Sequence, residues 1–129
     1  MAYGSPPRFN RATKAQAAQF LDEFFAKWNR HGFYFRKERT ENDWTLGELD
    51  MLASEVIPFI RALTAEDYYG GPIPDNRPER KAGPLWEFGT DVQGQQVYVK
   101  LQAGAPGAVV ICVSFHFPEH PLSFPHKSV

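Results

Sequence analysis

The sequence predicts an α+β domain in which two to three N-terminal helices pack on a small antiparallel sheet. Apolar residues recur at helical spacing through the first half of the chain. The last third instead holds three consecutive strand-like runs, over residues 85–89, 94–101 and 109–116. Helices that come first, followed by strands joined as a meander, are typical of the α+β class.

Composition favours one cytoplasmic domain without membrane contact. The 129 residues suffice for a single core, so we expect residues 1–12 to form a flexible tail and residues 13–129 one domain. Neither a long apolar run nor a secretory signal is visible. The single cysteine, Cys112, lies in an apolar run, which predicts a buried, inert thiol. With a net charge of −1, any contact with nucleic acid must be local.

The first helix is expected to begin after Thr13, which forms a capping box with Gln16, and to end at Gly32. An apolar stripe at helical spacing marks its buried face: Phe20, Leu21, Phe24, Phe25 and Trp28. Phe33–Phe35 is a candidate short strand. Residues 36–43 are charged and are predicted to form a loop.

A second helical region is predicted from Thr45, capped by Thr45 with Glu48. Pro58 divides this region into two helices, because proline lacks an amide hydrogen and clashes with the preceding turn, and Ser54 is an alternative cap for the second helix. Residues 67–84 are rich in proline and glycine and predict an ordered loop.

Alternation in the last two strand-like runs separates an apolar face from a polar one. Tyr98 and Lys100 lie opposite a face formed by Val97, Val99 and Leu101. In the following run Ser114 and His116 are expected to lie opposite a face formed by Val109, Ile111, Val113 and Phe115. Gly94 marks a hairpin turn, and the prolines after His116 predict an extended segment across the surface. A core face backed by Tyr, Lys, Ser and His suits the handling of phosphate and protons.

The order and spacing of four segments resemble the MqsR-type toxins of bacterial type II toxin–antitoxin systems, a branch of the RelE-like mRNA interferases. The segments are Leu63-Thr-Ala-Glu-Asp-Tyr68 with Gly71-Pro72, Leu85-Trp-Glu-Phe-Gly89, Gly94-Gln-Gln-Val-Tyr-Val-Lys100 and Val113-Ser-Phe-His116. The resemblance covers about residues 13 to 126. It implies a RelE/MqsR-like α+β fold, a metal-independent endoribonuclease that cleaves mRNA, and an antitoxin partner that carries a helix-turn-helix.

Within the family's pattern, the strand tyrosine corresponds to Tyr98, the polar residue after the tryptophan to Glu87, and the basic residue at the end of the last strand to His116. The sequence departs from the family's prototype at two places. Gly70 and Gly71 stand where the prototype has a lysine, and Glu87 stands in place of a glutamine.

Metal-free RNA cleavage needs a base, a cation near phosphorus and an acid. His116 suits acid or base work, because histidine titrates near neutrality, and Lys100 suits the stabilisation of charge on phosphate. Tyr98 would donate to phosphate or stack on a base, and Glu87 would act as base or orient His116. The products would end in 2′,3′-cyclic phosphate and 5′-hydroxyl. Three cations of the proline-rich segment are candidates for gripping the RNA backbone: Arg77, Arg80 and Lys81.

Simpler interpretations stay open. Tyr98 and Lys100 also suit an ordinary half-exposed strand, and His116 suits a solvated strand end. The cations at positions 77, 80 and 81 also suit a solvated loop. We expect no metal or cofactor, since prolines keep His116, His120 and His126 off one helix face. Two further functions fit the same fold, namely a non-catalytic protein-interaction module descended from a toxin, and a toxin that acts on a protein target.

Overall fold

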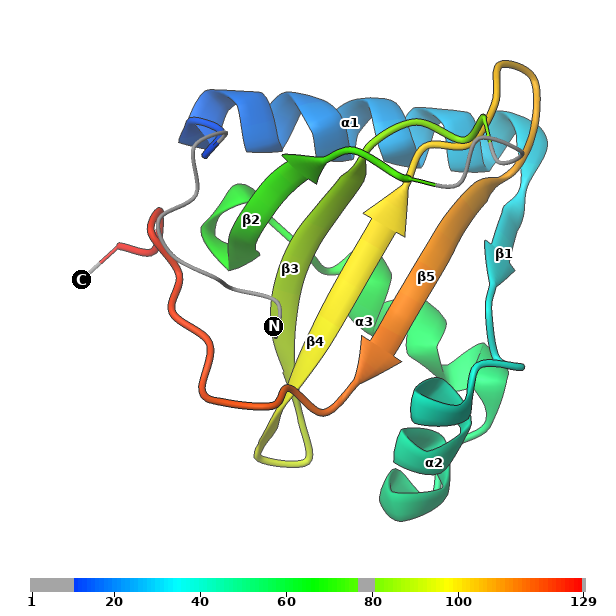
Figure 1. Ribbon diagram of the computed structural model, residues 1–129, viewed down its shortest axis with the longest axis vertical. Coiled ribbons are helices and arrows are strands. Elements are labelled where there is room, and N and C mark those ends of the chain that lie inside the picture. Colours follow the sequence, from blue (N-terminus) through cyan, green and yellow to red (C-terminus); the bar gives the residue numbers. More distant parts are fainter. Residues whose placement is uncertain (1–10, 77–80, 129) are drawn as a thin grey trace.

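The computed structural model describes residues 11–76 and 81–128. Three α-helices and a five-stranded sheet form its frame there, and the helices precede most of the sheet (Figure 1), which confirms the predicted α+β class. The helices are α1 (Lys14–His31), α2 (Thr40–Leu49) and α3 (Val56–Arg61), and the strands are β1 (Phe33–Phe35), β2 (Tyr68–Ile73), β3 (Leu85–Val92), β4 (Gln95–Gln102) and β5 (Val110–His116). Short 3₁₀ turns at Ala53–Glu55 and Ala65–Asp67 join the elements before β2.

The strands lie in the order β1-β5-β4-β3-β2, so the sheet extends the predicted three-strand meander at both edges. β2 to β5 are antiparallel neighbours, whereas β1 pairs with β5 in parallel. The prediction of a loop over residues 67–84 is wrong for Tyr68–Ile73, which form β2. Pro72 is tolerated there because an edge strand does not need every amide hydrogen for its ladder.

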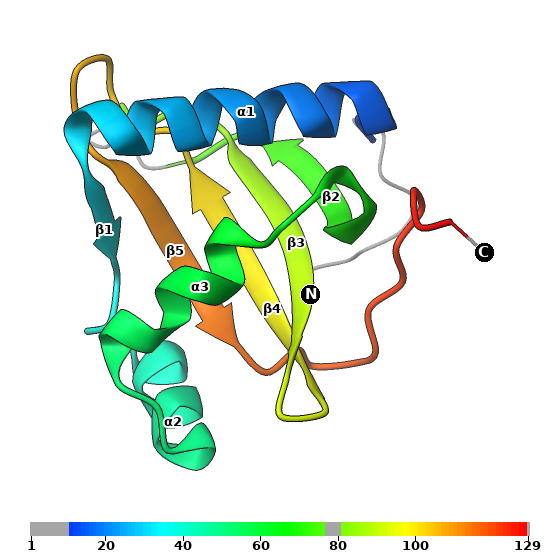
Figure 2. The same cartoon turned by 180° about the vertical axis from the view of Figure 1, so that it is seen from behind.

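The helices α1 and α3 cover one face of the sheet, and the segment after β5 crosses the other face (Figures 1 and 2). The main core lies under the helices and includes Phe24, Ile60, Phe88, Val99 and Leu101. A smaller cluster of Tyr69, Tyr98 and Leu122 forms on the opposite face. No described helix combines the length and the apolar character needed to cross a membrane.

Helix α1 follows the sequence prediction closely. Thr13 and Gln16 form the expected capping box, and Gly32 ends the helix by donating its amide to the Trp28 carbonyl. The buried stripe reaches the sheet, where the Phe20 ring stacks on Trp86 at 4.5 Å between centroids. Ala12, which the sequence assigned to the tail, is buried, and its amide donates to the Tyr68 hydroxyl at 2.8 Å.

Helix α2 begins at Thr40, before its expected start, so the loop predicted for residues 36–43 is wrong for Thr40–Asp43. Glu41 and Asp43 occupy its first turn, where negative charge favours the helix dipole. Thr45 is not a cap, because its buried hydroxyl accepts a hydrogen bond from the Phe117 amide. The prediction of two helices is confirmed, but they separate at residues 50–55 and not at Pro58. Pro58 lies in the first turn of α3, where a proline is tolerated, and Ser54 lies in a 3₁₀ turn and caps neither helix.

A β-bulge in β5 changes which of its residues face the core. Lys100 pairs with Ser114 but the next residue of β4, Leu101, pairs with Cys112, so Val113 is an extra residue. Val110 and Cys112 therefore join Phe115 in the main core. The predicted face of Val109, Ile111, Val113 and Phe115 is wrong, because strict alternation fails at a bulge. Cys112 is fully buried as predicted, and burial raises the pKa of its thiol.

Asn42 of α2 is fully buried and holds this bulge. Its amide nitrogen donates to the carbonyls of Arg36 (2.8 Å) and Val113 (3.1 Å), and its amide oxygen accepts from the Phe115 amide at 2.9 Å. The pairing of β1 with β5 ends at Cys112, and beyond that point one side chain, that of Asn42, binds backbone groups of both Val113 and Phe115. Asn42 thus fastens α2 to the end of β5.

We expect Asn42→Ala to lower the free energy of unfolding by about 3 kcal/mol, because unsatisfied buried polar groups each cost about 1–3 kcal/mol. Urea denaturation measures the loss. The matched control is Asn29→Ala, whose exposed side chain accepts one hydrogen bond from Arg61 and should change stability by less than about 0.5 kcal/mol. Equal stability of the two variants would show that the bulge does not depend on Asn42.

Candidate functional site

A pocket of about 400 Å³ lies where the start of α2 meets the end of β5 and the neighbouring part of β4 around Lys100. It is lined by Arg39, Thr40, Glu41, Trp44, Thr45, Lys100, Ser114, His116, Phe117 and Glu119. Topology creates this meeting point: β1 and β5 run in parallel, so the residues that follow each strand emerge at the same end of the sheet (Figure 1).

The sheet supplies three of the polar residues of the pocket. Lys100 on β4 pairs with Ser114 on β5, and two residues along each strand Tyr98 pairs with His116. The structure therefore brings His116, the candidate acid or base, and Lys100, the candidate cation for phosphate, to one pocket. The start of α2 adds a second cation, since the Arg39 guanidinium donates to the Ser114 hydroxyl and to the Val113 carbonyl, both at 3.1 Å.

His116 is only 5% exposed, and its Nδ1 lies 3.0 Å from the Phe117 carbonyl oxygen. A carbonyl only accepts, so this hydrogen bond requires the proton on Nδ1 and makes Nε2 the proton acceptor of the neutral ring. Burial lowers the pKa of His116, and the nearby Arg39 and Lys100 lower it further. The Phe117 carbonyl and Glu41 act in the opposite direction, but the net effect favours a neutral imidazole at neutral pH.

Glu41 stands at the same pocket and is exposed. A backbone hydrogen bond lowers the pKa of its carboxyl group, with smaller contributions from Arg39, His116 and Lys100. Glu41 is therefore ionised at neutral pH and sits beside the two cations. With Glu119, it brings negative charge to the lining of the pocket.

Tyr98 and Glu87 lie beneath the site rather than in its lining. Both are buried, and the Tyr98 hydroxyl donates to the Glu87 carboxyl group at 2.6 Å. The Tyr98 ring lies 5.4 Å from the His116 ring between centroids, and Lys100 Nζ lies 5.8 Å from the Tyr98 ring centroid. With no exposed surface, Tyr98 does not offer a face to RNA in this conformation. The Tyr98 ring is instead placed to support the side chains of His116 and Lys100.

The segment after β5 is what buries Tyr98. Leu122 packs on Tyr98 and Tyr69, and its amide donates to the Gln96 side chain at 2.9 Å. Gly89 permits this approach, because a Cβ there would lie 2.8 Å from side-chain atoms of Leu122 and Phe124. The predicted extended segment is thus a cover over this face of the sheet.

The three predicted RNA-binding cations belong to the segment between β2 and β3. Arg77 and Arg80 lie outside the described residues, and Lys81 is exposed but does not line the pocket. The carbonyl of its neighbour Ala82 accepts a hydrogen bond from the Gly104 amide, which places this segment beyond the last residue of β4. His126 stacks on Tyr68, so the three C-terminal histidines are not gathered. Across residues 11–76 and 81–128, no cluster of three or more His, Cys, Asp or Glu is placed to hold a metal ion.

Sequence reasoning missed the α2 side of the pocket, namely Arg39, Glu41 and Trp44. Arg39 and Glu41 fall in the loop predicted for residues 36–43, and Trp44 falls between that loop and the helix predicted from Thr45. No sequence pattern therefore connects these residues with His116. One signal was present: Trp44 is a large aromatic residue among polar neighbours, in a segment without an apolar stripe. It is 59% exposed in the structure.

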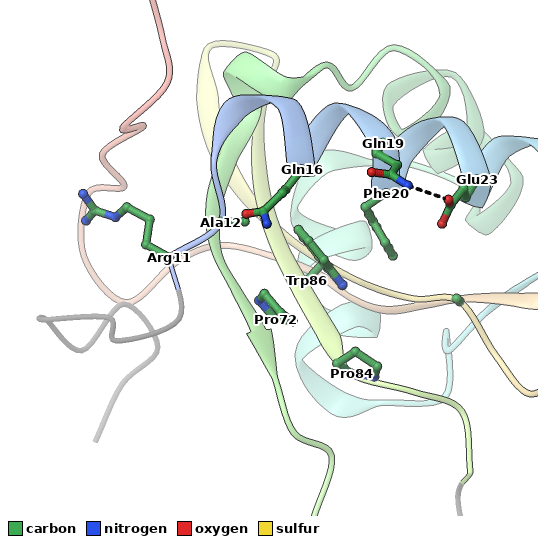
Figure 3. Close-up of a pocket in the computed structure, with 10 residues that line it drawn as sticks. Arg11, Ala12, Gln16, Gln19, Phe20, Glu23, Pro72, Pro84 and Trp86 are labelled. Carbon is green, nitrogen blue, oxygen red and sulfur yellow. Dashed lines mark hydrogen bonds between the residues drawn. The ribbon is translucent and has the colours of Figure 1, made fainter.

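A larger hollow of about 600 Å³ lies at the other side of the molecule, between α1 and the β2–β3 edge (Figure 3). Phe20, Trp86, Pro72 and Pro84 provide apolar walls, and Arg11 points away from them. Arg11 and Glu23 are the charged residues among its described lining. This hollow lacks the adjoining base and cations found at His116, so the smaller pocket is the better candidate site.

Comparison of this chain with protein-family models, with curated proteins and with solved structures finds no match in any of the three. The class that fold and site define is thus an α+β protein with a histidine–lysine–arginine pocket at one end of a mixed sheet. The resemblance to MqsR-type toxins stays a prediction.

The lowered pKa of His116 predicts a pH dependence of stability. Below the ordinary histidine value of about 6.5, the unfolded chain binds more protons than the folded chain at this residue. The free energy of unfolding therefore falls as the pH drops through this range, and the effect is absent above it. Urea denaturation from about pH 7.5 to about pH 5 should show a smaller fall in His116→Gln than in the wild type. His120→Gln, at an exposed position, is the control and should follow the wild type.

Proposed function

We propose that this protein is the toxin of a bacterial type II toxin–antitoxin system and that it cleaves mRNA in the cytoplasm without a metal ion. One observation supports this most: a neutral, buried His116 shares a pocket with Lys100, Arg39 and Ser114. These residues supply a proton acceptor and two cations, the groups that a transesterification at phosphorus requires.

In the proposed reaction, the 2′-hydroxyl of the substrate transfers its proton to Nε2 of His116. The Phe117 carbonyl holds Nδ1–H, which fixes the ring in the tautomer needed for that step. The 2′-oxygen attacks phosphorus, and the bond between phosphorus and the 5′-oxygen breaks. Electrostatic stabilisation of the extra negative charge falls to Lys100 and Arg39.

The departing 5′-oxygen needs a proton. Of the two cations at the pocket, Lys100 has a proton to transfer, because arginine does not deprotonate in proteins. The products would end in 2′,3′-cyclic phosphate and 5′-hydroxyl. His116 would then release its extra proton to solvent, and Lys100 would take one up from solvent. In this scheme Tyr98 and Glu87 act by position, as the buried layer beneath His116 and Lys100.

The regulatory half of the proposal rests on the resemblance in sequence. The segments around Trp86, Tyr98 and His116 resemble those of MqsR-type toxins in order and spacing. A cognate antitoxin, with a helix-turn-helix DNA-binding domain, would neutralise the toxin in the cell. The net charge of −1 is compatible with this function because the cations needed for phosphate are concentrated at one pocket.

A second candidate is a non-catalytic interaction module of the same fold. Two observations favour it: Tyr98 and Glu87 are buried together, and Glu41 and Glu119 place negative charge where RNA would bind. A third candidate keeps toxicity but moves the target to another protein.

The test is expression of the wild type, His116→Ala and Lys100→Met from a tightly repressed promoter, with growth and 5′-hydroxyl RNA ends measured together. We expect the wild type to arrest growth and create new ends. Loss of the general base should reduce cleavage by about 10²- to 10⁴-fold. His120→Ala, at an exposed position outside the pocket, is the matched control and should keep full activity.

The outcomes separate the three candidates. New RNA ends that depend on His116 and Lys100 support the ribonuclease. Growth arrest with intact RNA points to a protein target. If the folded wild type affects neither growth nor RNA, the interaction module is favoured, and cleavage products that end in 3′-hydroxyl would refute the proposed mechanism.

A further inference from the structure

We propose that Trp44 is a stacking platform for a nucleobase next to the scissile phosphate. This inference rests on the proposed ribonuclease function and identifies a substrate-positioning residue on α2. No residue of this helix was among the candidate site residues in the sequence.

Trp44 has an unusual position for so large an aromatic side chain. It is 59% exposed, yet it lines the same pocket as His116 and Lys100. The energetic cost of exposing an indole to water is reduced when the ring packs against a core, as the partly buried Trp86 does on Phe20. An exposed ring at the mouth of a polar pocket is instead available to a ligand with a flat face.

The orientation of Trp44 is held by Phe117, whose ring packs at 5.8 Å between centroids and 83° between planes. Phe117 is itself fixed, because its amide donates to the Thr45 hydroxyl at 3.2 Å. The carbonyl of the same residue binds Nδ1 of His116. One residue therefore fixes the aromatic platform and the tautomer of the candidate base relative to each other.

The chemistry of the pocket favours a nucleotide over an apolar peptide as the occupant. Two cations and the hydroxyl of Ser114 suit a phosphate, and the Trp44 ring suits a base beside it. An apolar helix or peptide would need several apolar walls, whereas Trp44 and Phe117 are the aromatic residues among the described lining. Stacking is tolerant of base identity because every base has a π-face.

Binding measurements test this without any need for cleavage. The probe is a short fluorescein-labelled single strand of mixed sequence, with every 2′-hydroxyl replaced by methoxy so that it cannot react. We expect Trp44→Leu to weaken binding by roughly 5- to 150-fold, the usual range for loss of one stacked base. Trp44→Phe should restore most of the affinity. Leu52→Ala removes another exposed apolar side chain, 70% exposed and outside the pocket, and should bind like the wild type.

A scan with single abasic sites locates the stacked base. At one position, removal of the base should weaken binding of the probe to the wild type. The same removal should leave binding to Trp44→Leu unchanged, because that variant has no ring for the base to stack on. Equal binding of the probe by wild type and Trp44→Leu would overturn the stacking role and leave the proposed function standing. If the wild type neither binds the probe nor cleaves RNA, both proposals fail.

Discussion

The hydrogen bonds that Asn42 makes to the bulged end of β5 hold the candidate site together. The bulge at Val113 shifts the phase of the strand, so that Val110 and Cys112 join Phe115 in the core while Ser114 and His116 face the pocket. Beyond Cys112, where the pairing with β1 ends, the buried backbone groups of β5 need other hydrogen-bond partners. Asn42 satisfies them from α2, and this contact places Arg39, Trp44 and Thr45 beside β4 and β5. The bulge and the helix therefore depend on each other.

Electrostatics at the pocket follows from this packing. The segment after β5 covers the face of the sheet that α1 and α3 leave open. Tyr98 and Glu87 are therefore buried beneath Lys100 and His116 and bind each other there. In such surroundings charges interact more strongly than in water. Burial also keeps His116 neutral, which gives a base at neutral pH where an exposed histidine would be partly protonated. The cover of the sheet is thus part of how the pocket acquires its chemistry.

Local patterns in the sequence predicted what depends on local physics. The capping box of Thr13, the helix stop at Gly32, the hairpin at Gly94 and the apolar face of β4 are all confirmed. Long-range pairing escaped prediction. No local pattern shows that β1 lies parallel to β5, or that Val113 is an extra residue in the ladder. Because the site forms where those two features meet, His116 and Lys100 were found as strand residues, while Arg39 and Trp44 were not.

The strand order has a consequence for how the molecule is made. β5 lies between β1 and β4, although it is the last strand in the sequence and β1 is the first. During synthesis β1 has no neighbour in the sheet until residues 110–116 have left the ribosome. The helix α2 likewise waits for the bulge that Asn42 binds. A nascent chain can form α1 and the β2–β3–β4 meander early, but it cannot assemble the pocket. Whatever chemistry the pocket performs therefore becomes possible only after β5 has been synthesised and has paired with β1.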